Sequence, residues 1–120
     1  MLKKHLIIST ANDLIRIAPE KIVYISSDGN YSNIMLTDNE TRMITNQLGQ
    51  IEAMINEQLG KDNFIRIGRS YIINRSYIYY INVPNQKLIL SDNLMFTHTV
   101  SASREALKML KELVEKEGKE

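Results

Sequence analysis

Cysteine is absent from the sequence, and there is no long apolar run. The lack of cysteine excludes disulfides, thiolate metal sites and a cysteine nucleophile. No run of apolar residues approaches the length of a membrane span, and the apolar stretch near the start is too short for a signal peptide. The composition therefore favours a cytoplasmic protein with no membrane partner.

Motifs for catalysis and for cofactor binding are missing as well. His5 and His98 lie far apart and form no His-x-x-x-His or Glu-x-x-His pair that would suggest a metal site. The chain has no glycine-rich loop for phosphates or dinucleotides and no Gly-x-Ser-x-Gly elbow. Asp28, Asp38 and Asp92 stand among turn residues, where hydrogen bonding to the local backbone is their expected role. We therefore expect neither an enzyme nor a bound cofactor or metal.

The charges of the chain are unevenly placed, although the net charge is only +1. Residues 64–91 include no acidic residue but contain three arginines and Lys87. Many of the surrounding residues are apolar or aromatic and favour β-structure. A basic, carboxylate-free segment on a rigid β scaffold is suited to face the phosphates of a nucleic acid.

The length of 120 residues predicts one domain, and hydrophobic periodicity predicts that most of it is β structure. Alternating apolar residues mark the strands, and Gly, Asn, Asp and Pro mark the turns between them. Residues 64–75 are interpreted as one half-buried strand that Gly68 interrupts. The predicted strands cover residues 6–10, 14–17, 21–27, 31–37, 41–44, 64–75, 77–81, 87–90 and 94–98.

Two stretches of the chain change to helical spacing. The central one predicts an amphipathic helix over about residues 46–59, with Thr45 or Asn46 as its cap and Gly60 at its end. The other is a C-terminal helix with apolar side chains every three or four residues. Candidate caps for this second helix are Ser101 and Ser103.

Three polar turns, at residues 28–30, 67–70 and 98–104, carry side chains that can recognise nucleic acid. Arginine can contact guanine in the major groove or enter a narrow minor groove, asparagine can contact adenine, and serine can hold phosphates. The alternative is that these turns only connect strands, and that Arg69 is an ordinary solvated arginine. Asn74, within an apolar strand, is expected to be a structural hydrogen-bonding residue, because a buried amide must be paired.

The segment Phe-x-Arg-Ile-x-Arg-Ser-Tyr-Ile-Ile-Asn at residues 64–74 resembles the core motif of LytTR DNA-binding domains. The resemblance runs from about residue 19 to 113 and includes Lys-Ile-Val-Tyr-Ile-x-x-x-Gly-Asn-Tyr at 21–31. It implies a mostly antiparallel β fold with few helices. It also implies a transcriptional regulator that inserts loops, not a recognition helix, into successive grooves of direct-repeat duplex DNA. Such domains are the output modules of bacterial two-component response regulators.

The resemblance places the contacts with DNA in three segments, after the first long strand, in the motif itself and before the last helix. Two departures stand out, because Gly68 replaces a histidine that many members carry, and the residues directly after Ser101 are not basic. Arg104 is then the candidate for a shifted basic contact. Together with the basic segment, the expected DNA-binding residues are Asn30, Tyr31, Ser32, Asn33, Arg66, Gly68, Arg69, Ser70, Ser101, Ser103 and Arg104.

The expected organisation is an N-terminal hairpin or linker remnant at 1–18, the DNA-binding domain at 19–115 and a frayed tail at 116–120. The expected partner is double-stranded DNA, with a dimer on direct-repeat sites. Either a receiver domain precedes this segment in a longer native chain, or the domain stands alone. Two other functions stay open, namely a β-rich protein-interaction domain that does not bind DNA and a binder of RNA or single strands that uses the tyrosines.

Overall fold

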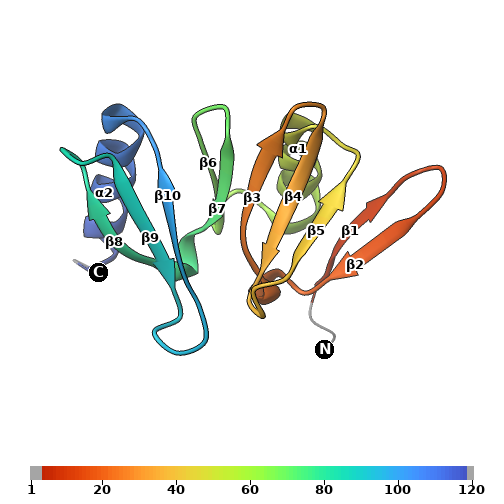
Figure 1. Cartoon of the computed structure of the whole chain (residues 1–120), viewed down its shortest axis with the longest axis horizontal. Coiled ribbons are helices and arrows are strands. Elements are labelled where there is room, and N and C mark those ends of the chain that lie inside the picture. Colours follow the sequence, from red (N-terminus) through yellow and green to blue (C-terminus); the bar gives the residue numbers. More distant parts are fainter. Residues whose placement is uncertain (1–3, 119–120) are drawn as a thin grey trace. The chain divides into compact units, whose positions relative to one another are not determined.

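The computed structural model describes residues 4–118 and confirms the predicted fold, with antiparallel sheets and two helices (Figure 1). No helix in this part of the chain is long and apolar enough to cross a membrane. The chain consists of two compact units, and the boundary between them lies between Ser76 and Tyr77. The strands are β1 (Leu6–Ser9), β2 (Leu14–Ile17), β3 (Ile22–Asp28), β4 (Tyr31–Leu36), β5 (Thr41–Ile44), β6 (Phe64–Ile67), β7 (Tyr71–Asn74), β8 (Ile78–Asn82), β9 (Lys87–Ser91) and β10 (Thr97–Ser101). The helices are α1 (Leu48–Leu59), α2 (Arg104–Glu117) and the short 3-10 turns η1 (Pro19–Lys21) and η2 (Arg75–Tyr77).

The first unit is organised around a five-stranded sheet in the order β5-β4-β3-β7-β6. All of its pairs are antiparallel. In β3 the pairing with β4 shifts register between Ile22 and Tyr24. Because such a bulge changes which face successive side chains point to, Ile22 and Ile25 both join the same buried cluster despite their odd spacing.

Helix α1 packs against the sheet, and the β1–β2 hairpin contacts α1 and contributes side chains to the same core (Figure 1). The apolar stripe of α1 is buried, as the helical spacing predicted. The buried cluster consists of Leu6, Ile8, Ile22, Ile25, Ile34, Ile44, Leu48, Ile51, Ile55, Phe64 and Ile72.

The β1–β2 hairpin is tied to α1 by polar contacts as well as by its apolar side chains. The side-chain amide of Gln58 accepts from the Ile7 N–H and donates to the Ile7 carbonyl, both at 2.8 Å. This pair occupies the outer edge of β1, which would otherwise leave unpaired backbone groups at an edge strand. Residues 1–3 of the predicted 1–18 segment lie outside the described residues.

In the second unit, β8, β9 and β10 form a three-stranded antiparallel sheet, and α2 contacts β8. Apolar side chains from β9, β10 and α2 are buried. Helix α2 extends to Glu117, past the predicted start of the tail at 116, and residues 119–120 lie outside the described part. The buried side chains in the two strands, the connecting loop and α2 are Leu88, Leu90, Phe96, Val100, Leu107 and Leu110.

The predicted strand at 94–98 was wrong in its position, because β10 begins at Thr97. The carboxylate of Asp92 accepts hydrogen bonds from the backbone N–H groups of three consecutive residues, Leu94, Met95 and Phe96. The distances are 2.9, 2.7 and 3.1 Å. These bonds hold residues 92–96 in a compact loop and remove the N–H groups that a strand would need.

Two other local predictions were also corrected. Residues 64–74 form a hairpin of β6 and β7 instead of one interrupted strand, and Gly68 lies in the turn with φ of +63°. The cap of α1 is Gln47, not Thr45 or Asn46, and its N–H donates to the side chain of Gln50 at 2.8 Å. The Gln50 N–H donates in turn to the Gln47 backbone carbonyl at 3.0 Å, so Gln47 and Gln50 are joined by two hydrogen bonds at the start of the helix.

Candidate nucleic-acid interface

Two polar turns of the first unit lie next to each other at one end of the five-stranded sheet (Figure 1). The pairing of β3 with β7 continues past the last strand pair, because the Ser27 N–H donates to the Ser70 carbonyl at 2.9 Å. This bond brings the β3–β4 turn, with Gly29 and Asn30, beside the β6–β7 turn, with Gly68 and Arg69. Residues about forty positions apart in the sequence therefore share one surface.

The β3–β4 turn presents Asn30 to solvent. Gly29 has φ of +62°, which L residues with a side chain rarely adopt, and it allows the tight reversal between the strands. The Asn30 side-chain oxygen accepts from the Gln47 amide at 3.3 Å, so the start of α1 orients this side chain. Tyr31 is 47% exposed, and Asn33 donates to the Asp28 carboxylate at 3.4 Å.

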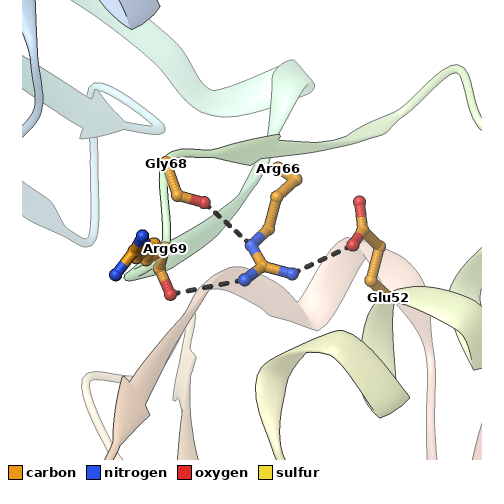
Figure 2. A network of polar contacts seen from close by, with 4 residues as sticks. All are labelled: Glu52, Arg66, Gly68 and Arg69. Carbon is orange, nitrogen blue, oxygen red and sulfur yellow. Dashed lines mark hydrogen bonds and ion pairs between the residues drawn. The ribbon is translucent and has the colours of Figure 1, made fainter.

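The β6–β7 turn presents Arg69 and Ser70, which are both exposed. Within residues 4–118 the Arg69 side chain forms no hydrogen bond or ion pair, and Figure 2 shows its guanidinium directed away from the neighbouring polar contacts. An exposed cation on a turn is accessible to a ligand without first breaking an internal contact. Arg69 is thus the available positive charge of this pair of turns.

Arg66, at the other side of the same turn, forms an internal contact through each of its three side-chain nitrogens (Figure 2). Its Nη1 contacts the Glu52 carboxylate of α1 at 2.9 Å. Its Nε donates to the Gly68 carbonyl at 3.0 Å, and its Nη2 donates to the Arg69 carbonyl at 3.4 Å. Arg66 therefore connects the turn to α1 and does not extend freely into solvent.

Ser32 differs from the expected surface position. Its side chain is completely buried, at 0% exposure, and its hydroxyl donates to the Asn46 carbonyl at 2.9 Å. In a strand, side chains alternate between the two faces, and the neighbours Tyr31 and Asn33 take the other face. Residues two apart share a face, so Ser32 lies on the same buried face as Ile34, and the alternation of the strand could have indicated this.

The third expected segment, Ser101–Arg104, lies in the second unit at the junction of β10 and α2. Ser103 caps α2, with its hydroxyl accepting from the Ala106 N–H at 3.1 Å, and this resolves the predicted choice of caps. Arg104 donates to the Pro84 carbonyl at 3.2 Å. Ser101 and Arg104 are both exposed, so this segment offers a hydroxyl and a guanidinium on the surface of its unit.

Two residues that contact the β3–β4 and β6–β7 turns were missed by the sequence interpretation. Gln47 contacts Asn30, and its role at the helix start was detectable from the Gln50 three positions later. Glu52 contacts Arg66 across fourteen positions, and no local pattern marks such a pair. In the described part of the chain there is also no group of three or more residues suited to hold a metal ion.

Comparison with known proteins identifies the family. Residues 12–115 match the sequence model described as the LytTr DNA-binding domain. A solved LytTr DNA-binding domain from Bacillus cereus has the same fold, with a TM-score of 0.65 and 24% sequence identity, over 93% of this chain and 97% of that chain. No curated protein matches the chain. Because the family model covers most of the sequence, the chain belongs to the LytTr family of DNA-binding domains.

Proposed function

We propose that this protein binds duplex DNA with sequence preference and regulates transcription. The observation that carries the proposal is the pair of adjacent turns at one end of the sheet. Asn30 and Arg69 lie on this surface, and the exposed Arg69 side chain forms no hydrogen bond or ion pair with any residue of the described part of the chain. Arginine forms bidentate contacts with guanine, and asparagine does so with adenine. Two such side chains on neighbouring turns suit the edges of bases within one groove.

The remaining expected residues have supporting roles in this proposal. Tyr31, Asn33 and Ser70 flank the two turns and are placed to contact sugar and phosphate, which fix the register of a protein on DNA. Ser101 and Arg104 provide a separate contact from the second unit. Because the two units carry separate loops, we propose insertion into successive grooves of direct-repeat sites, with one protein copy on each repeat.

The biological setting of the proposal follows from the family. We propose that residues 19–115 act as the output domain of a cytoplasmic two-component response regulator, joined to a receiver domain in the longer native protein. The proposal requires no cofactor and no catalysis.

The proposal is tested by selecting bound duplexes from a random pool with the purified chain. We expect an enriched sequence that recurs at a fixed spacing, and binding to it that weakens steeply as salt rises, because bound counterions are released. Equal retention of random and selected duplexes would overturn the proposal. Preferential binding of single strands, or salt-insensitive capture of a protein, would favour the two alternative functions, because an apolar protein interface responds much less to salt.

A further inference from the structure

The β6–β7 turn, which carries Arg69, is held from one side by a single side chain (Figure 2). A Cβ added at Gly68 would meet no atom within 4 Å, so close packing at this position does not fix the turn. Instead, the guanidinium of Arg66 donates to two successive carbonyls of the turn, those of Gly68 and Arg69. The planar fork of a guanidinium fixes the relative direction of such donors.

The position of Arg66 is itself determined by α1. Glu52 lies in the second turn of this helix, and its carboxylate contacts the third nitrogen of Arg66 at 2.9 Å. The side chains of Arg66 and Glu52 are 28% and 37% exposed, so both remain partly solvated. An ion pair with this exposure adds little to the stability of the fold. Its geometric effect is larger, because it connects the turn to a helix that packs into the core.

We infer that Glu52 and Arg66 are positioning residues that hold the β6–β7 turn in the conformation in which Arg69 recognises a base. This inference rests on the proposed DNA-binding function. Sites for recognition need their contacting groups held within a fraction of an ångström by supporting contacts. The Arg69 side chain forms no hydrogen bond or ion pair among residues 4–118, so the conformation of the Arg69 backbone, which Arg66 contacts, sets the direction in which the side chain leaves the turn.

The same geometry argues against a direct DNA contact by Arg66. Three of its nitrogens already have protein acceptors. A phosphate that approached Arg66 would have to compete with the Glu52 carboxylate and would be repelled by its negative charge. Arg66 therefore acts through the turn and not through its own charge.

The test compares Glu52→Gln with Glu57→Gln, and uses the selected duplex and a scrambled duplex. Both glutamates lie on α1, and both substitutions remove one negative charge, which by itself strengthens attraction to DNA. Glu57 is exposed and has no ion pair within the described residues, so it controls for charge alone. We expect Glu52→Gln to reduce the preference for the selected duplex about three- to tenfold, and Glu57→Gln to leave it unchanged.

Arg66→Lys provides a second variant that keeps the charge but cannot span both carbonyls and Glu52. We expect it to lose sequence preference with an unchanged salt dependence, because lysine keeps the positive charge that sets the salt slope. Thermal melting of each variant checks that the fold persists. Intact sequence preference in a folded Arg66→Lys variant would overturn the positioning role, because lysine cannot make all three contacts of the guanidinium.

A double-mutant cycle links both residues to Arg69. In an Arg69→Ala background, we expect Glu52→Gln to cause no further loss of preference, because the side chain that it positions is absent. Full additivity would overturn the inference. If the wild-type chain shows no preference at all, the proposed function fails and the inference fails with it. If the wild type shows a preference and Glu52→Gln behaves like Glu57→Gln, only the inference fails.

Discussion

The side-chain amide of Asn74, at the end of β7, donates to the backbone carbonyl of Ile22, at the start of β3, at 2.8 Å. The oxygen of the same amide accepts from the Ser76 N–H at 2.9 Å and from the Asn63 side chain at 3.1 Å. Asn74 is only 1% exposed. One buried side chain thus joins two strands and the 3-10 turn that follows β7, which confirms the structural role predicted for it.

Asn74→Ala is expected to harm folding more than DNA recognition. Removing the amide leaves buried polar groups without partners, which costs about 1–3 kcal/mol in the free energy of unfolding. Chemical denaturation measures this loss. Asn74→Asp should also destabilise, because a carboxylate cannot donate to the Ile22 carbonyl. A variant with wild-type stability and selectively lost DNA binding would contradict the structural assignment.

Leu6→Ala tests whether the N-terminal hairpin belongs to the core of the first unit. Leu6 is completely buried in the cluster that includes α1 and the central sheet, so truncation should cost about 2–5 kcal/mol. Ile7→Ala is the control, because Ile7 is 42% exposed and contacts Gln58 only through its backbone in the bonds described above. Equal stabilities of the two variants would show that the hairpin is dispensable for this core.

Substitutions of Gly68 should act through backbone conformation alone. Its φ is +63°, and a Cβ would have open space around it. Gly68→Ala is therefore expected to cost about 1–2 kcal/mol, the penalty of a left-handed conformation for an L residue. Gly68→His should cost less, because histidine and asparagine adopt this region more readily. A larger loss for histidine than for alanine in thermal denaturation would contradict this explanation.

Asp92 gives the second unit a predictable response to acid. Burial raises the pKa of its carboxyl group, but the N–H groups of Leu94, Phe96 and Met95 outweigh this, so the pKa lies below its ordinary value of 3.8. A lowered pKa in the folded state stabilises the fold above the ordinary value, and this stabilisation is lost as the pH falls through the lowered pKa.

This is tested by measuring the melting temperatures of the wild type and Asp92→Ala from about pH 2 to about pH 7, a range that includes the ordinary pKa of an aspartate. We expect Asp92→Ala to melt lower at neutral pH, with the difference shrinking below the ordinary pKa. Asp92→Asn should fall between them, because an amide oxygen still accepts from the backbone. A difference that does not change with pH would contradict a role for the charge.

Local patterns predicted most of the fold, because alternation and helical spacing depend on neighbouring residues. The strand at 41–44 and the end of α1 at Gly60 are examples. The errors arise where a side chain competes with the backbone or acts at long range. The hydrogen bonds to the Asp92 carboxylate hold residues 94–96 in a loop, so β10 begins three residues later than predicted. The Glu52–Arg66 contact depends on how α1 packs on the sheet. Neither interaction leaves a periodic signal in the sequence.

Arg69→Ala is expected to be the most damaging single change for DNA binding. Arg69 is exposed, lies in the carboxylate-free segment 64–91, and its side chain forms no hydrogen bond or ion pair within the described residues. If it recognises a base, its loss should cost about 1–3 kcal/mol on the selected duplex and relax preference at one or two positions. If it contacts only phosphate, binding should fall equally on all duplexes, and the salt slope should decrease by about one unit.

Arg16→Ala is the matched control for this variant. Arg16 is an exposed arginine of β2, outside the five-stranded sheet, and its removal changes the net charge by the same amount. Titrating both variants against selected and scrambled duplexes at several salt concentrations separates the loss of a specific contact from the loss of one charge. If Arg69→Ala folds and still prefers the selected duplex as strongly as Arg16→Ala does, Arg69 does not recognise a base. Recognition would then have to depend on Asn30 in the adjacent turn and on Arg104 in the second unit.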